Sequence, residues 1–422
     1  MAELAAIEDG AVLIRDGLIA AAGPSDHVSG EAGRNAHVID ASGSVVMPGY
    51  VDAHTHPVFA GTREDEYCLR AAGLTYQEIA ARGGGILSTV RNTRAASEQE
   101  LFELALPRVQ RFLSYGTSTI EAKSGYGLTL EDELKILRVI RRLAEETPLD
   151  VVPTFLGAHE IPAEFRNPDE PGQGREEYLR LVTDEMLPAV ARDRLARFCD
   201  VFCESHVFTP EESRTVLNRA GELGLGARLH AEQLTLCGGA RLGAELGAAT
   251  VDHLENIDDD GIACLGVSGV IGVLLPGAVF NLGLTRYAPA RKLIDAGVPV
   301  VLATDFNPGT CPTEAMTAIL PSACLDFGLT PAEAIVAATS NAAYALGLSG
   351  TVGSLEVGKA ADAQILDVPN HLHLVYHFGV NHCRTVVKRG RVVVEDGAIA
   401  GGTGRAGAGN AAPDKASGGI GP

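Results

Sequence analysis

Two histidines separated by one residue are the first feature that suggests chemistry in this chain. His54 and His56 directly follow the apolar run GYVDA. If that run is a β-strand, alternate side chains point to the same side, so the two imidazoles form a two-ligand clamp for a metal ion. The motif alone also fits a surface or structural pair, so the metal hypothesis needs further ligands.

Three more potential ligands occupy a similar position, at the end of an apolar run. His230 ends GARLH, His253 ends ATVDH and Asp305 ends VPVVLATD. The carboxyl ends of parallel barrel strands converge on one mouth, so these side chains are expected near His54 and His56. Three imidazoles with one carboxylate suit Zn²⁺ or Fe²⁺ better than Ca²⁺ or Mg²⁺. The sequence therefore predicts a site for one divalent metal, zinc or iron.

The elements that would position these residues are eight short apolar runs, which alternate with amphipathic stretches. That rhythm predicts a (β/α)8 TIM-like barrel over residues 49–352. Capping boxes predict helix starts after Ser97, Thr209 and Thr330. The predicted strands lie within the segments GYVDAHTH, TSTIEAK, VVPTFLGAH, DVFCESH, GARLHAE, ATVDHLE, VIGVLLPG and PVVLATD.

Both ends of the chain contain short strand-like runs separated by turn-forming Gly and Asp. Residues 1–48 and 353–400 are therefore expected to form one small β-sandwich domain. Residues 401–422 are rich in Gly and Ala without periodicity, so we expect a disordered tail there. The polar segment RNPDEPGQGREE is expected to be a loop near the barrel mouth.

Composition excludes several classes of function. The 34 Lys and Arg residues face 54 Asp and Glu residues, and the resulting charge of −20 disfavours nucleic-acid and anionic-membrane partners. The eight cysteines show no CxxC spacing, which fits reduced thiols. Acidic residues near the N-terminus do not resemble a signal peptide, and no apolar run is long enough to span a bilayer. We expect a cytoplasmic protein acting on a small molecule.

The pattern of HxH followed by His, His and Asp resembles the amidohydrolase superfamily, in the group that uses one metal. Longer blocks resemble the imidazolonepropionase family, from about Val45 to Gly397. They include PGYVDAHTHPVFAGTREDE, IEAKSGYGLTLEDELKILRVIRRL, HAEQL and LATDFNPGT. The resemblance implies hydrolysis of the ring amide C–N bond of 4-imidazolone-5-propanoate to N-formimidoyl-L-glutamate in histidine degradation. Such barrels often dimerise, so a homodimer is expected.

By this resemblance, His54, His56, His230 and Asp305 hold the metal. His253 stands close to it as an acid/base or oxyanion-stabilising group, and the alternative for His253 is a fifth ligand. Some relatives carry Glu where this chain has Gln233, and a neutral amide cannot abstract a proton. The catalytic proton acceptor is therefore Asp305 or His253, and the sequence does not separate them.

The resemblance also gives a set of substrate contacts. A guanidinium fork with neutral donors suits a propanoate group, so Arg63 with Tyr126 and His159 could bind it through charge-assisted hydrogen bonds. Five of these contacts have an alternative: Arg63 pairing with the acids at 64–66, Tyr126 as a turn aromatic, His159 as a structural histidine, and the residues at 307 and 309 shaping a turn. The predicted contacts are Arg63, Tyr126, His159, Gln233, Asn307, Gly309 and Thr310.

The remaining polar residues and the chain as a whole allow alternative interpretations. Lys123 is expected to be structural, because it lies on the second predicted strand and relatives with a carbamylated lysine between two metals place it on the fourth. The histidines at 371, 373, 377 and 382 are expected to be structural and not a second metal site. The rival functions are a deaminase of a cytosine-like or guanine-like ring and a catalytically dead scaffold protein.

Overall fold

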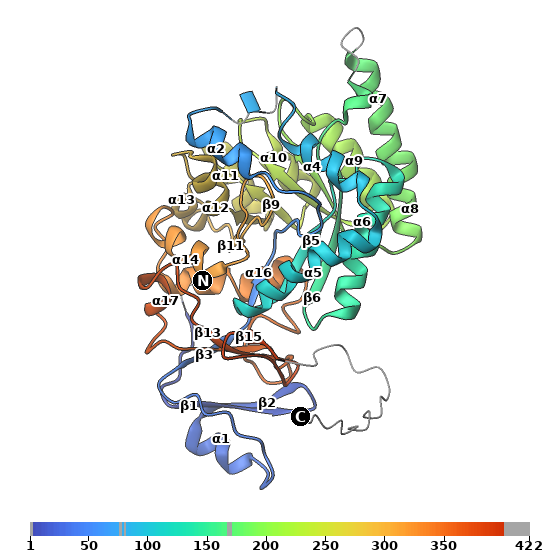
Figure 1. Ribbon diagram of the computed structural model, residues 1–422. Coiled ribbons are helices and arrows are strands. Elements are labelled where there is room, and N and C mark those ends of the chain that lie inside the picture. The colour runs from blue at the N-terminus through green and yellow to red at the C-terminus, as the bar shows by residue number, and fades with distance from the viewer. Residues whose placement is uncertain (1–2, 76–77, 80–81, 167–170, 401–422) are drawn as a thin grey trace, which may run out of the picture.

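The computed structural model describes residues 3–75, 78–79, 82–166 and 171–400 (Figure 1). The predicted disordered tail, 401–422, lies outside the described residues. Among the described residues, no helix is both long enough and apolar enough to cross a membrane.

Eight parallel strands form the centre of the molecule, and each overlaps one of the eight predicted segments, although β6 and β7 begin one and two residues earlier than predicted. The first and last strands meet through a parallel bridge between Thr55 and Phe306, and His56 N donates to Phe306 O at 2.8 Å. The sheet therefore closes into the predicted barrel. Neighbours in the sheet follow chain order: β4 (Tyr50–Asp52), β5 (Thr117–Lys123), β6 (Asp150–Ala158), β7 (Phe198–Cys203), β8 (Gly226–Ala231), β9 (Thr250–His253), β10 (Ile271–Leu274) and β11 (Val300–Leu302).

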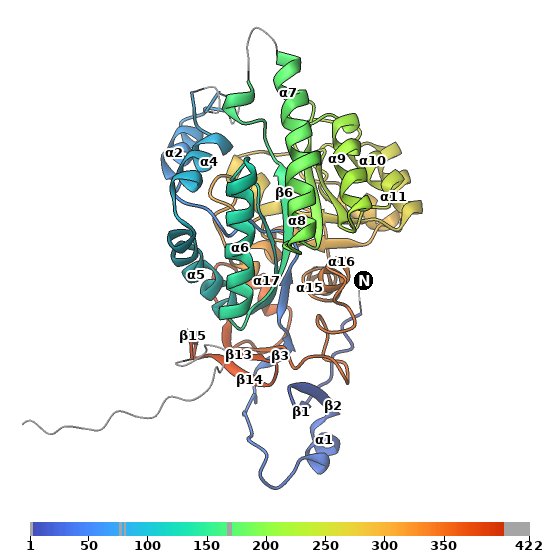
Figure 2. The same cartoon turned by 90° about the vertical axis from the view of Figure 1, so that its right-hand side faces the viewer.

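Helices cover the outside of the barrel (Figures 1 and 2). They are α2 (Glu64–Ala71), α4 (Ile86–Ala95), α5 (Glu98–Ser114), α6 (Leu130–Glu146), α7 (Pro171–Arg180), α8 (Leu187–Arg192), α9 (Pro210–Glu222), α10 (Gly239–Leu246), α11 (Asp259–Ser268), α12 (Pro276–Leu282), α13 (Ala290–Asp295), α14 (Met316–Leu325), α15 (Pro331–Ala337), α16 (Ser340–Ala345) and α17 (His373–Tyr376), with a 3-10 turn η1 (Ala163–Phe165) and a π-helical stretch η2 (Leu181–Met186).

Local sequence explains how these helices start and which face they bury. Complete capping boxes open α5 at Ser97, α9 at Thr209 and α15 at Thr330, as predicted. In α6, Ile136 and Ile140 lie one turn apart and are buried, as expected for an amphipathic helix on a barrel. One expectation was too simple, because α7 begins at Pro171, inside the polar segment predicted to be a loop.

Strands from the N-terminal and C-terminal parts of the described chain lie below the barrel (Figure 2). Strand β3 (Val45–Pro48) pairs antiparallel with β12 (Ala363–Leu366), and β13 (Cys383–Lys388), β14 (Arg391–Glu395) and β15 (Ala398–Ile399) complete a five-stranded sheet. A separate hairpin of β1 (Gly10–Arg15) and β2 (Leu18–Pro24) precedes α1 (Ser25–Glu31). Ile19 N donates to Lys359 O at 2.9 Å, which ties this hairpin to the C-terminal part. The expected contribution of both ends to a small β unit is confirmed, whereas the domain boundaries stay predictions.

The capping box of α9 gives a test of the forces that hold the barrel helices. In Thr209→Ala, the N-terminal backbone loses a hydrogen-bond acceptor, and we expect the free energy of unfolding to fall by about 1 kcal/mol. The matched control is Thr215→Ala in the same helix, an exposed position where Ala is the better helix former. Urea unfolding followed by circular dichroism measures both. Equal stability of the two variants would contradict the capping interpretation.

Candidate metal centre and its pocket

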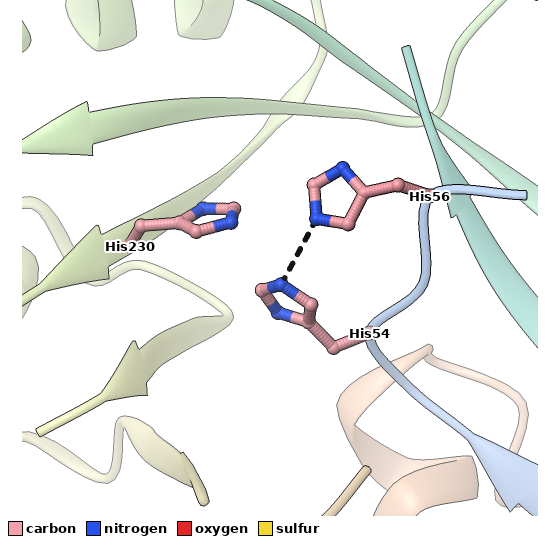
Figure 3. A group of neighbouring side chains, drawn as sticks. All are labelled: His54, His56 and His230. Carbon is pink, nitrogen blue, oxygen red and sulfur yellow. Dashed lines mark hydrogen bonds between the residues drawn. The ribbon is translucent and has the colours of Figure 1, made fainter. Parts of the chain in front are cut away.

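Five side chains predicted to do chemistry meet at the carboxyl ends of the barrel strands. His54 and His56 follow β4, His230 lies in β8, His253 ends β9 and Asp305 follows β11. All five are buried. Figure 3 shows the rings of three of them, His54, His56 and His230, pointing toward one another.

The distances between ligand atoms define one common centre. His54 Nε2 lies 3.4 Å from His56 Nε2, and Asp305 Oδ1 lies 3.4 Å and 3.6 Å from these two nitrogens. Two groups with converging ligand atoms share His54: one adds His56 and His230, and the other adds His253 and Asp305. The structure thus brings together all of the residues predicted around the metal.

The protonation of the histidines fits a bound cation. Burial lowers the pKa of His54 and His56 well below the usual value and that of His230 to about 4, so all three are neutral at pH 7. The ring of His54 contacts Asp252 through Nδ1 at 2.6 Å, which leaves Nε2 facing the centre. Two neutral Nε2 atoms 3.4 Å apart, beside a carboxylate, form a donor set that suits zinc or ferrous iron. On this observation, the residues fit the predicted metal.

Backbone strain accompanies the strand ends that carry His253 and Asp305. Their φ angles are 83° and 55°, in the left-handed region that non-glycine residues rarely adopt. Hydrogen bonds from Asp305 N to His54 O and from Asn307 Nδ2 to Asp305 O hold the second residue in place. Such strain gathers at functional sites when the surrounding structure fixes it.

His253 and Asp305 also differ in their electrostatics. Burial raises the pKa of Asp305 to about 7. Burial alone would lower the pKa of His253, but the carboxylates of Glu255, Asp305 and Asp252 together raise it, with Glu255 contributing most. Glu255 Oε1 lies 3.5 Å from His253 Nδ1, and its side chain is buried. Sequence reasoning missed Glu255, although its position two residues after His253, at the end of the predicted segment ATVDHLE, was a usable signal.

A pocket opens beside this centre and contains six of the seven predicted substrate contacts. Sequence reasoning missed its apolar wall, which comes from different elements: Ile86, Phe202, Leu234 and Leu282. Leu234 could have been found, because it follows the predicted contact Gln233 in the motif HAEQL, and Phe202 alternates with Asp200 along β7. The predicted contacts that line the pocket are Arg63, Tyr126, His159, Gln233, Asn307 and Thr310.

Arg63 both lines the pocket and pairs with an acid. The predicted substrate contact and the alternative ion pair are therefore compatible. Its Nε and Nη2 donate to Glu66 Oε2 at 2.9 Å and 2.7 Å, while Gly85 N donates to Glu66 Oε1 at 2.9 Å. Gly309 does not line the pocket, but a Cβ there would lie 2.0 Å from Arg63 Nη1. Glycine at 309 therefore leaves the space that the guanidinium occupies.

His159 lies against the metal centre. Its ring stacks on that of His56 with 5.4 Å between centroids, and the ring centroid of Tyr126 also lies 5.4 Å from that of His159. Burial lowers the pKa of His159 to about 4. Nδ1 lies 2.9 Å from Gly125 O, and because a carbonyl only accepts, the neutral ring carries its proton on Nδ1. Its Nε2 is thus a hydrogen-bond acceptor.

Asn307 shapes the loop after the last strand as well as lining the pocket. Its Oδ1 accepts from Gly309 N at 2.8 Å and Thr310 N at 2.7 Å, and its Nδ2 donates to Thr310 Oγ1 at 2.8 Å. Thr310 Oγ1 in turn lies 3.4 Å from Asp305 Oδ2. Asn307 and Gly309 therefore do shape the turn, as the alternative interpretation of these residues proposed.

Two other polar features lie outside this centre. Lys123 is buried within ion pairs, as a structural lysine would be. The rings of His373, His377 and His382 have centroids 4.9 to 5.8 Å apart, and His382 Nε2 bonds His377 O at 3.0 Å. In the described part of the chain, these three do not form a group of converging metal-ligand atoms.

Comparison with known proteins agrees with this geometry. The pattern of the Amidohydrolase family matches residues 45–393. The imidazolonepropionase of Symbiobacterium thermophilum is 52% identical over 402 residues, covering 94% of this chain and 93% of the relative. The imidazolonepropionase of Solibacter usitatus is 53% identical over 393 residues, covering 93% of each chain.

Solved structures support the fold. A zinc-bound adenosine deaminase from Xanthomonas campestris aligns with a TM-score of 0.70 and 19% identity, covering 94% of this chain and 90% of the deaminase. Guanine deaminase from E. coli aligns with a TM-score of 0.69 and 17% identity, covering 92% and 93%. At such identities the likeness concerns the fold alone. The family match and the relatives near 50% identity show more than the fold. This chain belongs to the amidohydrolase family and, within it, to the imidazolonepropionases.

Proposed function

We propose that this protein hydrolyses the ring amide of 4-imidazolone-5-propanoate and releases N-formimidoyl-L-glutamate, a step of histidine degradation. One water molecule is consumed and one ring C–N bond breaks. The observation that carries the proposal is the buried group of histidines and Asp305 beside a pocket lined by Arg63. The identity of the substrate follows from the membership of this chain in the imidazolonepropionase family.

The proposed ligands of one divalent ion, Zn²⁺ or Fe²⁺, are His54, His56, His230 and Asp305. When bound, such an ion polarises a carbonyl oxygen and lowers the pKa of a water molecule toward neutrality. The neutral imidazoles each offer a lone pair, which is the form that binds a metal. Zinc in the related fold of the deaminase from Xanthomonas campestris supports zinc as the first ion to test.

The structure supports a division of the proton chemistry that the sequence left open. Asp305 directs Oδ1 toward His54 and His56, while its Oδ2 lies toward Thr310. We assign the acceptance of the proton from the attacking water to Oδ2. His253, whose pKa is raised by Glu255, is suited to donate a hydrogen bond to the developing oxyanion.

The pocket can hold the two parts of the substrate separately. Arg63 with Tyr126 provides donors for the propanoate. His159 was expected to help bind this anion, but its low pKa makes it neutral and its Nε2 an acceptor, so we assign it to a ring N–H. Phe202 and Leu234 provide apolar surface against the ring.

Neither rival function gains support. The deaminases share only the fold, and a guanidinium in the pocket favours an anionic substrate over a neutral base. A dead scaffold has no use for a buried, converging set of ligands. The homodimer and the cytoplasmic location stay predictions from sequence; light scattering of the purified protein tests the first.

The first experiment measures turnover of 4-imidazolone-5-propanoate, generated in place from urocanate, by protein of known metal content. We expect loss of the imidazolone without ammonia release, and His230→Ala should lower the rate by about a thousandfold or more, roughly 4 kcal/mol of barrier. His373→Ala, in the histidine cluster away from the pocket, is the matched control and should stay active. Absence of turnover by fully metallated protein, or release of ammonia, would contradict the proposed function.

A second experiment tests recognition of the propanoate. Replacing Arg63 by Met removes a charge-assisted hydrogen bond worth about 1.5–3 kcal/mol, so kcat/KM should fall by roughly 10- to 150-fold, mainly through KM. Arg63→Lys keeps the charge but not the fork, and should lie between Met and wild type. The control is Arg389→Met, which removes an exposed guanidinium paired with Asp150. An unchanged KM in Arg63→Met would exclude this role.

A third experiment follows the stability of the metal-free protein against pH. Burial holds the pKa of His159 and His230 at about 4, below the usual value of 6.5. Between pH 6.5 and about 4 the unfolded state binds protons that the folded state does not, so stability present above pH 6.5 is lost on acidification. Each histidine contributes up to roughly 1.4 kcal/mol per pH unit.

His159→Gln should therefore reduce the slope of unfolding free energy against pH, as measured by urea titrations. The exposed His27 gives the control His27→Gln, which should keep the wild-type slope. An identical slope in His159→Gln and wild type would show that His159 binds its proton as readily in the folded protein as in the unfolded chain, which contradicts the lowered pKa.

A further inference from the structure

A group of five charged side chains lies inside the barrel, and the proposed reaction leaves them without a role. Glu121 and Lys123 come from β5, Asp200 from β7, Arg228 from β8 and Asp252 from β9. All five are fully buried. Burying charges is unfavourable unless they are paired, and apolar residues usually fill a barrel interior. A cluster of this size therefore calls for an explanation beyond packing.

Lys123 is the centre of the cluster. Its Nζ lies 2.7 Å from Glu121 Oε1, 2.7 Å from Asp200 Oδ2 and 3.7 Å from Asp252 Oδ2. Burial alone would lower the pKa of Lys123, but the carboxylates of Asp200 and Glu121 outweigh it and raise the pKa. The side chain is thus a charged ammonium between three acids, which is incompatible with its being a carbamylated metal ligand.

Two of these acids reach upward to histidine rings of the metal centre. Asp252 Oδ2 lies 2.6 Å from His54 Nδ1. Asp200 Oδ2 lies 3.0 Å from His230 Nδ1, and Asp200 Oδ1 accepts from His230 N at 3.1 Å. In both cases the acid meets the ring nitrogen on the side away from the common centre.

The remaining two members contact the backbone that carries the HxH motif. Arg228 Nη2 donates to Ala53 O at 2.8 Å, just before His54. Glu121 Oε2 lies 3.4 Å from Thr55 N, and Thr55 Oγ1 donates to Glu121 O at 2.6 Å. Asp200 and Asp252 therefore contact proposed ligands, and Glu121 and Arg228 contact the backbone beside them. Lys123 pairs with the acids of the cluster.

We infer that Asp252 and Asp200, anchored by Lys123, are positioning residues of the metal centre. Asp252 accepts a hydrogen bond from Nδ1–H of His54, and the Asp200 carboxylate lies 3.0 Å from Nδ1 of His230. Both contacts favour a proton on Nδ1, which leaves Nε2 as the ligand atom. This inference rests on the proposed function, because it assumes that His54 and His230 bind a metal. It adds to that function the residues that set the affinity of the site.

A merely structural cluster would hold the barrel together without affecting the metal. The small sheet offers a comparison, since Lys388 pairs with Asp362 there and both are buried. Asp362 also accepts from Arg389 N at 2.9 Å. The change Asp362→Asn therefore alters a buried, lysine-paired aspartate away from the metal centre and is a matched control.

The experiment compares Asp252→Asn, Asp200→Asn and Asp362→Asn in the full chain. Zn²⁺ affinity of the metal-free proteins is measured by competition with a chromogenic chelator, beside the thermal unfolding temperature. An amide keeps the shape but removes the charge, so we expect 10- to 100-fold weaker Zn²⁺ binding in the first two variants. Asp362→Asn should bind Zn²⁺ like wild type even if it unfolds at a lower temperature. Wild-type affinity in both Asp252→Asn and Asp200→Asn would overturn the inference.

A spectroscopic measurement on the unaltered protein covers the case in which these variants do not fold. Nitrogen-15 labelling of the 12 histidines distinguishes the two neutral ring tautomers by NMR. The inference requires the Nδ1–H form for His54 and His230 in metal-free protein, with assignment from His54→Ala and His230→Ala. An Nε2–H form at both positions would overturn it.

The same variants separate this inference from the proposed function. If His54→Ala binds Zn²⁺ as wild type does, the proposed metal site itself is wrong. If His54→Ala loses Zn²⁺ while Asp252→Asn and Asp200→Asn retain it, only the positioning role fails.

Discussion

A group of charges without access to water lies inside the barrel, in contact with the proposed metal ligands, and its pairing constrains the rest of the site. Three carboxylates, of Glu121, Asp200 and Asp252, face two cations, Lys123 and Arg228, within a closed barrel. In a medium of low polarity each charge must be paired or hydrogen-bonded. The strands that carry these charges also carry or adjoin the histidines. The pairing of the five charged side chains therefore fixes the backbone from which the imidazoles project.

Closure of the barrel depends on the same segments. The hydrogen bonds that join the end of β4 to the end of β11 run from Asp305 N to His54 O and from His56 N to Phe306 O. Three proposed ligands are thus part of the seam that closes the sheet. The unusual backbone of Asp305 and His253 is tolerable in this setting, because neighbouring hydrogen bonds hold strained residues in place.

The sequence predicted features whose signal is local. Each strand appears as an apolar run, three helix starts appear as capping boxes, and the ligand residues stand where apolar runs end. Features that arise from contacts between distant segments could not be predicted in this way. The pairing of Asp200 with His230 joins two strands, and the apolar wall of Ile86 and Phe202 joins an external helix to the barrel interior.

The protonation of His159 was also beyond the sequence. We propose hydrogen-bond acceptance for His159 in place of anion binding, because the side chain is deeply buried and Nδ1 faces Gly125 O. A similar fold in deaminases shows that the barrel does not determine the substrate. The choice of substrate must therefore depend on the side chains that line the pocket. There, Glu66 holds the guanidinium of Arg63 in the space that Gly309 leaves, and charge and shape at that point favour an anionic tail over a neutral ring alone.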